Sequence, residues 1–260
     1  LQNEQKRYQR IMTRQMIIAQ EQEREHIGHE LHDNVNQILT TVKLYNEMLS
    51  HIKQTDTNVP YRSGNYFYYS RTEEGKQYPI FCRKKGSPEA PEEIILDMNE
   101  LAKGQKFMSL GMLNPSDDGN ILAYSTDNTG YRQFLLQFKD LRTGQLLPEK
   151  IERVTGLAWG NDNKTFFYVT EDPVTKRNDK FFRRVLGTDK ADLVYEEKDE
   201  LFDIGTGRSL DKKVIFLESF SKTSTEVSYV LAAEPNAAGG PAAVRRACPG
   251  SPWGHPAVPP

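Results

Sequence analysis

Apolar positions along the chain change their period near residue 54. Between residues 27 and 52 they recur at steps of three and four, which places them on one face of a helix. They are Ile27, Leu31, Val35, Ile38, Val42, Tyr45, Leu49 and Ile52. No proline interrupts residues 1–53, and Ile11, Ile17 and Ile18 allow the helix to continue upstream. We therefore expect a long amphipathic α-helix whose apolar stripe needs a partner, as in a helix-mediated homodimer.

From residue 54 onward, short apolar or alternating stretches follow one another and are typical of β-strands. Aromatic and β-branched residues are frequent in them, and polar turn clusters such as 116–120 and 160–164 separate them. The predicted strands are Tyr66–Ser70, Pro79–Arg83, Ile94–Asp97, Phe107–Leu110, Ile121–Ser125, Phe134–Leu141, Leu157–Trp159, Phe166–Thr170, Phe181–Leu186, Leu193–Tyr195, Val214–Glu218 and Val227–Ala232.

A polar turn followed by a strand occurs four times within this region. The repeats begin at Gly64, Gly119, Asn163 and Asp211, so their starts lie 55, 44 and 48 residues apart. About four strands at this period are typical of one blade of a β-propeller. We expect a mainly β fold, a partial β-propeller of about four blades, and a β-sandwich with long loops is the alternative.

Composition divides the chain into three segments. Residues 1–53 hold four of the five histidines, whereas residues 54–235 hold 23 of the 26 aromatic residues and no histidine. Residues 236–260 hold six of the fourteen prolines and no acidic residue. We expect a helix over 1–48, the β region over 49–235, and a disordered tail over 236–260, or one read out of frame.

Charge and cysteine content exclude several classes of function. The chain has 34 basic and 36 acidic residues and a net charge of -2, which argues against a nucleic-acid partner. No apolar run approaches the 18 or so residues of a membrane span. Its two cysteines, Cys82 and Cys248, supply neither a disulfide framework nor a four-cysteine zinc site. We expect a cytoplasmic protein with no cofactor and no bound metal.

The segment Glu30–Gln37 reads Glu-Leu-His-Asp-Asn-Val-Asn-Gln, and with residues 23–27 it resembles the phosphoacceptor helix of bacterial sensor histidine kinases. The resemblance implies that His32 accepts a phosphoryl group, that Asp33 polarises its imidazole, and that Gln37 positions a water for dephosphorylation. Gln37 lies a little over one helical turn beyond His32, so its amide can approach the same ring edge. No ATP-binding domain follows, so the segment is at most an orphan acceptor. The pattern alone indicates a plain dimerising helix, with His26, His29 and His51 on its surface.

Residues 53–61 and 68–79 resemble the start of the propeller in the oligopeptidase B (protease II) group of the prolyl oligopeptidase family, which are serine peptidases. The likeness continues through 116–128, 154–162 and 189–202. It implies a seven-bladed propeller that gates an α/β-hydrolase domain cleaving short peptides after Arg or Lys. Short basic peptides are then the partners if such a domain completes the chain. Residues 43–49 fit both resemblances, which suggests a chimera formed by recombination or sequence assembly.

The family's catalytic Ser, Asp and His lie in the hydrolase domain, which we expect this chain to lack. No G-x-S-x-G sequence is present, and no histidine occurs between His51 and His255. No peptidase residue is therefore assigned as catalytic. The leading hypothesis is an inactive fragment of an oligopeptidase B-like endopeptidase, and the alternatives are a phosphorelay fragment and a non-catalytic propeller scaffold.

Other motifs of the β region have structural interpretations. Residues 205–209 are predicted to form a turn rather than a phosphate loop, and Asn163-Lys164-Thr165 is predicted to be a turn rather than a glycosylation site. Cys82 is expected to fill a strand. The acidic residues Glu196, Glu197, Asp199 and Glu200 are expected to form a solvated edge, whose charge would attract basic peptides.

Overall fold

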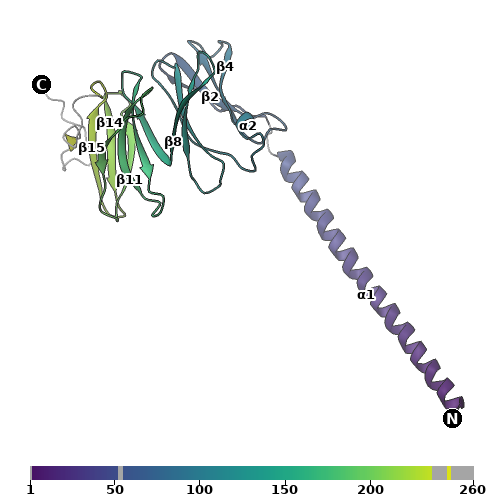
Figure 1. The fold of residues 1–260 in the computed structure, drawn as a ribbon. Helices are drawn as coiled ribbons and strands as arrows, with labels where there is room; N and C mark the ends of the chain where they lie inside the picture. Colours follow the sequence, from purple (N-terminus) through teal and green to yellow (C-terminus); the bar gives the residue numbers. More distant parts are fainter. Residues whose placement is uncertain (1, 52–54, 236–244, 247–260) are drawn as a thin grey trace. The chain divides into compact units, whose positions relative to one another are not determined.

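The protein is described by a computed structural model that covers residues 2–51, 55–235 and 245–246 (Figure 1). Its contacts divide it into two units, residues 1–54 and residues 55–260. Among the described residues, those of the first unit form one helix and those of the second hold all the strands, so the change of apolar period near residue 54 coincides with a structural boundary.

The first unit contains α1 (Gln2–His51), a single helix of 50 residues. The helix predicted from the apolar stripe is therefore confirmed, and it ends three residues beyond the boundary expected at residue 48. Ile52, the last residue of the predicted stripe, lies outside the described residues. Neither α1 nor the short α2, the helices of the described residues, has an apolar stretch able to cross a membrane.

The second unit contains four antiparallel sheets of four strands, each in chain order. Sheet 1 consists of β1 (Tyr61–Ser63), β2 (Tyr66–Arg71), β3 (Ile80–Lys85) and β4 (Glu92–Asp97) and is followed by α2 (Met98–Leu101). Sheet 2 consists of β5 (Ser109–Pro115), β6 (Ile121–Asp127), β7 (Leu135–Asp140) and β8 (Leu146–Glu152). Sheet 3 consists of β9 (Val154–Trp159), β10 (Thr165–Glu171), β11 (Asn178–Val185) and β12 (Ala191–Glu196). Sheet 4 consists of β13 (Asp203–Arg208), β14 (Val214–Phe220), β15 (Thr225–Leu231) and β16 (Arg245–Arg246).

The repeat seen in the sequence is the turn between the first and second strands of each sheet. One residue in each of these turns has a positive φ: Gly64 (58°), Gly119 (71°), Asn163 (56°) and Lys212 (61°). Tight hairpin turns need this left-handed conformation, which glycine and asparagine adopt at little cost. Four separate four-stranded sheets, each in chain order, confirm the propeller arrangement and exclude the two sheets of a sandwich.

Some strands of the structure were not predicted from the sequence, and the reasons can be identified. Residues 205–208 belong to β13 rather than to the predicted turn, because their backbone pairs in register with β14 and needs no side chains to do so. Strand β8 holds Pro148 and three charged residues, a composition that only an edge strand tolerates. In the segment expected to be disordered, residues 245–246 pair with β15 as β16, and the rest of 236–260 lies outside the described residues.

Apolar layers between consecutive sheets form the core. Between sheets 1 and 2 the layer includes Tyr66, Tyr68, Ile95, Leu96, Met98, Met108, Leu122 and Tyr124. Between sheets 2 and 3 it includes Ala123, Leu136, Phe138, Val154, Leu157, Trp159, Phe166 and Tyr168. Between sheets 3 and 4 it includes Ala158, Phe167, Val169, Phe181, Val194, Ile204, Ile215, Leu217, Val230 and Ala232. Successive side chains of a strand point to opposite faces of its sheet. Each inner sheet therefore contributes side chains to the apolar layers on both of its faces.

A buried arginine braces the first two sheets. Arg83 of β3 pairs with Glu93 at 2.7 Å and donates to the carbonyl of Gly119 in the turn before β6. Its guanidinium lies 4.1 Å from the centre of the Tyr66 ring. A Cβ atom at Gly119 would collide with that same ring. The turn at Gly119 thus serves both its own hairpin and the contact with sheet 1.

We predict that Gly119→Ala lowers the free energy of unfolding by about 2–4 kcal/mol, because it combines a positive φ with a clash against Tyr66. The matched control is Gly144→Ala, at a φ of 76° with open space around its Cβ position, which should cost only about 1 kcal/mol. Urea unfolding of both variants measures the difference. Equal losses would show that Tyr66 moves aside without cost.

Candidate functional site

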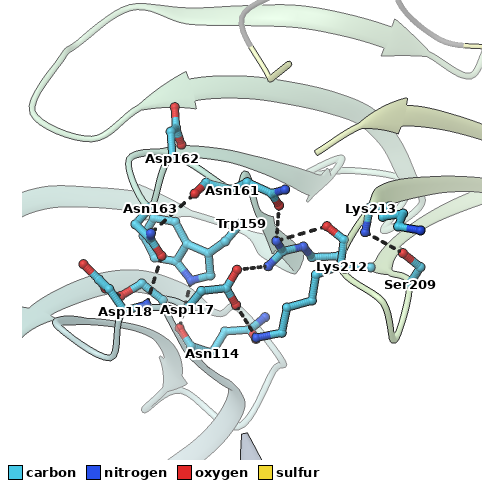
Figure 2. A network of polar contacts seen from close by, with 12 residues as sticks. Asn114, Asp117, Asp118, Trp159, Asn161, Asp162, Asn163, Ser209, Lys212 and Lys213 are labelled. Atoms are coloured by element: carbon cyan, nitrogen blue, oxygen red, sulfur yellow. Dashed lines mark hydrogen bonds and ion pairs between the residues drawn. The ribbon is translucent and has the colours of Figure 1, made fainter. Parts of the chain in front are cut away.

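The first strands of sheets 2, 3 and 4 lie beside one another, with β9 between β5 and β13. The turns that follow these strands meet at one end, and Figure 2 shows the polar side chains gathered there. We call this end, formed by residues 114–120, 157–164 and 206–213, the inner rim. First strands arranged side by side are the inner strands of a propeller, so the inner rim is the candidate functional site.

Two contacts align the inner strands. Asn114 of β5 donates from Nδ2 to the carbonyl of Leu157 at 2.9 Å, and Trp159 Nε1 donates to the carbonyl of Asn114 at 3.0 Å. Between β9 and β13, a Cβ at Gly156 would lie 3.2 Å from Thr206 Cγ2, so the missing side chain allows close approach. The three strands are therefore held in one relative position.

An ionic contact joins sheet 2 to sheet 4 across the turn of sheet 3. Asp117 forms an ion pair with Arg208 Nη1 at 2.8 Å and accepts a hydrogen bond from Lys212 Nζ at 2.6 Å. Arg208 also donates to the side-chain oxygen of Asn161 and, at 3.3 Å, to the carbonyl of Lys212. We call these four residues the Asp117 junction. Because the Arg208 side chain is only 14% exposed, its charge is screened less by water than that of a surface pair.

Other aspartates at the inner rim support their own turns. Asp118 accepts from the Ser116 hydroxyl at 2.6 Å, Asp162 from the Thr165 amide at 2.8 Å, and Asp211 from the Ser209 hydroxyl at 2.7 Å.

These hydrogen bonds favour the ionised carboxylates. Burial raises the pKa of Asp118 and Asp162, but the hydrogen bonds outweigh it and hold both below the usual value. The Ser209 hydroxyl likewise lowers the pKa of Asp211. In the described part of the chain, no three His, Cys, Asp or Glu side chains are grouped so that they could hold a metal ion.

The acidic stretch at 196–200 is only partly a solvated edge. Glu196, Asp199 and Glu200 are exposed as expected, but Glu197 accepts from Tyr195 at 2.8 Å and from Ser219 of β14 at 2.6 Å. Burial opposes ionisation of Glu197, and these hydrogen bonds outweigh it, so its pKa lies below the usual value. Glu197 therefore joins sheet 3 to sheet 4, and this corrects its assignment to the solvated edge.

The residues predicted to form a phosphoacceptor site lie on α1. His32 is exposed, and its Nδ1 lies 3.8 Å from Asp33 Oδ1. The amide found against the ring belongs to Asn36, at 3.0 Å from Nδ1, since residues four apart share a helix face. The roles of His32, Asp33 and Gln37 stay predictions. His26, His29 and His51 are exposed, as predicted.

Two further predictions concern Cys82 and Asn163. Cys82 is buried in β3 as a free thiol, and burial raises its pKa to about 11, so it fills the strand in its protonated form. Asn163 lies in a turn at positive φ, as predicted, and its Oδ1 accepts from the Asp118 amide at 3.1 Å. Cys248 lies outside the described residues.

Sequence reasoning missed the Asp117 junction. Asp117 and Arg208 lie about ninety positions apart, and no local pattern links an aspartate in one turn with an arginine in another. The repeat was the one feature of the sequence that could have indicated this contact, because Asp117 and Lys212 both lie in repeated turns. Aligned repeats place those turns at the same end of neighbouring sheets.

Comparison with known proteins identifies a family that matches the β unit and the second half of α1. The family described as prolyl oligopeptidase, N-terminal beta-propeller domain, matches residues 22–249. Dipeptidyl aminopeptidase BI of Pseudoxanthomonas mexicana is 38% identical over 211 residues, which cover 74% of this chain and 29% of that protein. Protease 2 of Moraxella lacunata is 33% identical over 200 residues, which cover 73% of this chain and 29% of that protein.

Among solved structures, oligopeptidase B from Leishmania major is similar with a TM-score of 0.74 and 30% identity, over 80% of this chain and 29% of that one. Oligopeptidase B from Trypanosoma brucei is similar with a TM-score of 0.71 and 29% identity, over 80% of this chain and 29% of that one. The chain spans less than a third of the length of these relatives. The comparisons do not support the resemblance of residues 1–48 to a histidine kinase.

We predict that Asp117→Asn lowers the free energy of unfolding by about 1–2 kcal/mol, because two cations lose the carboxylate between them. Hydrogen exchange should rise in residues 208–213. Glu100→Gln, which removes an exposed i, i+3 pair with Lys103, is the control and should change stability by less than about 0.5 kcal/mol. Equal effects of the two variants would contradict a structural role for the junction.

Acid should weaken the β unit through an aspartate at the end of a strand. Asp140, the last residue of β7, is contacted by the Arg142 guanidinium at 2.6 Å, which lowers its pKa to about 2. Its pKa when unfolded is about 3.9, so its stabilising contribution is present above about pH 4 and is lost as the pH falls towards 2. Asp140→Asn should therefore be less stable at pH 7 but lose less stability between pH 5 and pH 2. Parallel losses in variant and wild type, measured by urea unfolding, would contradict this role.

Proposed function

The chain belongs to the prolyl oligopeptidase family, through that family's N-terminal β-propeller domain, and from this premise we propose that it forms the substrate-gating part of an oligopeptidase B-like serine endopeptidase. The observation that carries the proposal is the inner rim, where the Asp117 junction connects the turns of three sheets. Blades held rigidly around the inner strands admit only substrates of small size. This is the property that a gate for short peptides needs.

Sheet 4 presents a surface suited to a further blade. Register places Phe216, Tyr229, Val227 and Leu231 on the face opposite to the one that packs on sheet 3, where Ile215, Leu217 and Val230 lie. The three existing interfaces bury apolar faces of this kind. We propose that in a longer polypeptide a fifth sheet covers this face, in line with the seven blades that the resemblance implies.

The proposed substrates are short peptides cleaved after Arg or Lys. The preference follows from the resemblance, and the exposed carboxylates of Glu196, Asp199 and Glu200 support it, because they supply a negative field. Glu197 is excluded from this role by its hydrogen bonds to Tyr195 and Ser219.

We propose that these 260 residues alone do not hydrolyse peptides. The β region from 54 to 235 contains no histidine, and the four histidines described by the structure, at 26, 29, 32 and 51, lie on α1. General-base catalysis of the Ser-His-Asp type needs a histidine beside the nucleophile.

A cytoplasmic location is part of the proposal, supported by the free thiol of Cys82.

The experiment uses the chain alone and a hybrid of Protease 2 from Moraxella lacunata, in which this chain replaces the matched 200 residues. We predict no turnover of an Arg-containing chromogenic peptide by the chain alone. The folded hybrid should cleave that peptide and leave casein, a large unfolded protein, intact.

Inhibitor-sensitive turnover by the chain alone would refute the proposed lack of catalysis. A folded hybrid that cleaves casein as fast as the peptide would refute gating and favour the alternative of a non-catalytic scaffold. No contact of the described residues favours the phosphorelay alternative over the peptidase fragment or over the non-catalytic scaffold.

A further inference from the structure

The β unit has a second end, opposite to the inner rim, where the first strand of each sheet begins. We call it the entry end, because the chain enters sheet 1 there. The Asn58 amide donates to the carbonyl of Ser70 at 2.9 Å, and the Thr72 amide donates to that of Asp56 at 2.8 Å. In antiparallel sheets the fourth strand also ends at this end, as β4, β8 and β12 do. A domain joined to the propeller before its first strand or after its last is therefore attached at the entry end.

The loop between β6 and β7 lies at the entry end and is built around a buried carboxylate. We call residues 128–134 the Tyr131 loop. Asp127, the last residue of β6, is only 2% exposed. One of its carboxylate oxygens accepts from the Thr129 amide at 2.8 Å and from the Thr129 hydroxyl at 2.6 Å, and the other accepts from the Arg132 amide at 2.8 Å. One side chain thus fixes the path of the whole loop.

The backbone of the Tyr131 loop has an unfavourable conformation and lies beside the inner strands. Gly130 has a φ of 79° and Arg132 a φ of 58°, and the second value is unfavourable for a residue with a side chain. Asn128 Nδ2 donates to Gln105 Oε1 at 3.3 Å, and a Cβ at Gly130 would lie 4.0 Å from Phe107 Cδ1. Residues 105–107 lead into the inner strand β5. Backbone outliers that the surrounding contacts enforce are frequent at functional sites.

The side chains that the loop presents are those of a protein contact. Tyr131 is 78% exposed, and Arg132 beside it is exposed as well. Tyrosine and arginine are the residue types that contribute most to binding at interfaces. The Tyr131 amide donates to Thr129 Oγ1 at 3.1 Å, so the backbone that carries the ring is already ordered. Binding then costs less conformational entropy than it would from a mobile loop.

Neighbouring connections extend this surface. Val174, between β10 and β11, is 85% exposed, and Leu201, between β12 and β13, is 78% exposed. Both connections lie at the entry end. Three exposed side chains are few for a separate protein, whose stable interface would bury about 1,200 Å² or more. A domain tethered at the same end needs a smaller interface, because the tether keeps its effective concentration high.

We propose that the Tyr131 loop is a docking contact for the hydrolase domain of the longer polypeptide, and that Tyr131 holds the two domains closed over the peptide. The inference rests on the proposed function. It adds a particular loop, held in place by Asp127, to the part that the propeller plays in gating.

The first test compares the chain alone with the hybrid of Protease 2 by hydroxyl-radical footprinting and mass spectrometry. We expect Tyr131 to react several-fold less in the folded hybrid than in the chain alone, because the hydrolase domain covers it. Leu210, fully exposed in a turn of the inner rim, is the internal control and should react equally in both. Protease 2 carrying only residues 128–134 of this chain at the matched position is a second variant for the same measurement. Equal reactivity of Tyr131 with and without the hydrolase domain overturns the proposal.

The second test is Tyr131→Ser in the hybrid, with Leu210→Ser as the matched control. We expect Tyr131→Ser to lower kcat/KM for the Arg-containing peptide about tenfold, the loss typical of one strong interface residue. Casein cleavage should rise, because the domains are held together less firmly. Leu210→Ser should change neither rate. In the chain alone, Tyr131→Ser should leave urea unfolding unchanged, since the ring is exposed.

Unchanged cleavage of both substrates by the Tyr131→Ser hybrid overturns the proposal, even where the parent hybrid is active and gated. A folded hybrid without any turnover refutes the proposed function instead. Footprinting still decides the docking contact in that case, because it requires a folded hybrid and no activity.

Discussion

Burial of aromatic and aliphatic side chains between consecutive sheets is the interaction on which the β unit depends. Each sheet is too small to bury both of its faces, so it is stable only against a neighbour. The layer between sheets 2 and 3 shows the contact most clearly, since Phe138 lies 4.9 Å from Phe166 and 5.9 Å from Trp159 between ring centres. Alternation along the strands repeats this contact from one sheet to the next, and the result is a row of blades.

Polar contacts then determine how the blades sit on one another. Arg83 holds sheet 1 to the turn of sheet 2, Glu197 holds sheet 3 to sheet 4, and the Asp117 junction crosses three sheets. Such contacts add modestly to the free energy of folding, because each charge is first removed from water. Their directionality matters more for the relative position of the sheets, because an apolar layer alone allows one sheet to slide over the next.

The two units differ in what they still require. The β unit has three buried interfaces and an apolar face on sheet 4, so more sheet is the natural completion. The helix exposes an apolar stripe whose residues recur at steps of three and four. Both units therefore leave apolar surface exposed, one on a sheet face and the other along a helix.

Local patterns in the sequence were sufficient to determine the long helix, twelve of the strands, the four-fold repeat and the likeness to a propeller of peptidases. Such patterns hold because a period of 3.6 or 2 and a residue able to adopt positive φ act over a few neighbouring residues. Only the tertiary structure decided the rest. Strands β8 and β13 exist because of their neighbours, Glu197 is bound rather than solvated, and Asp117 meets Arg208 across three sheets. In each case the packed sheets bring together residues that are distant in sequence. No short-range pattern carries that information.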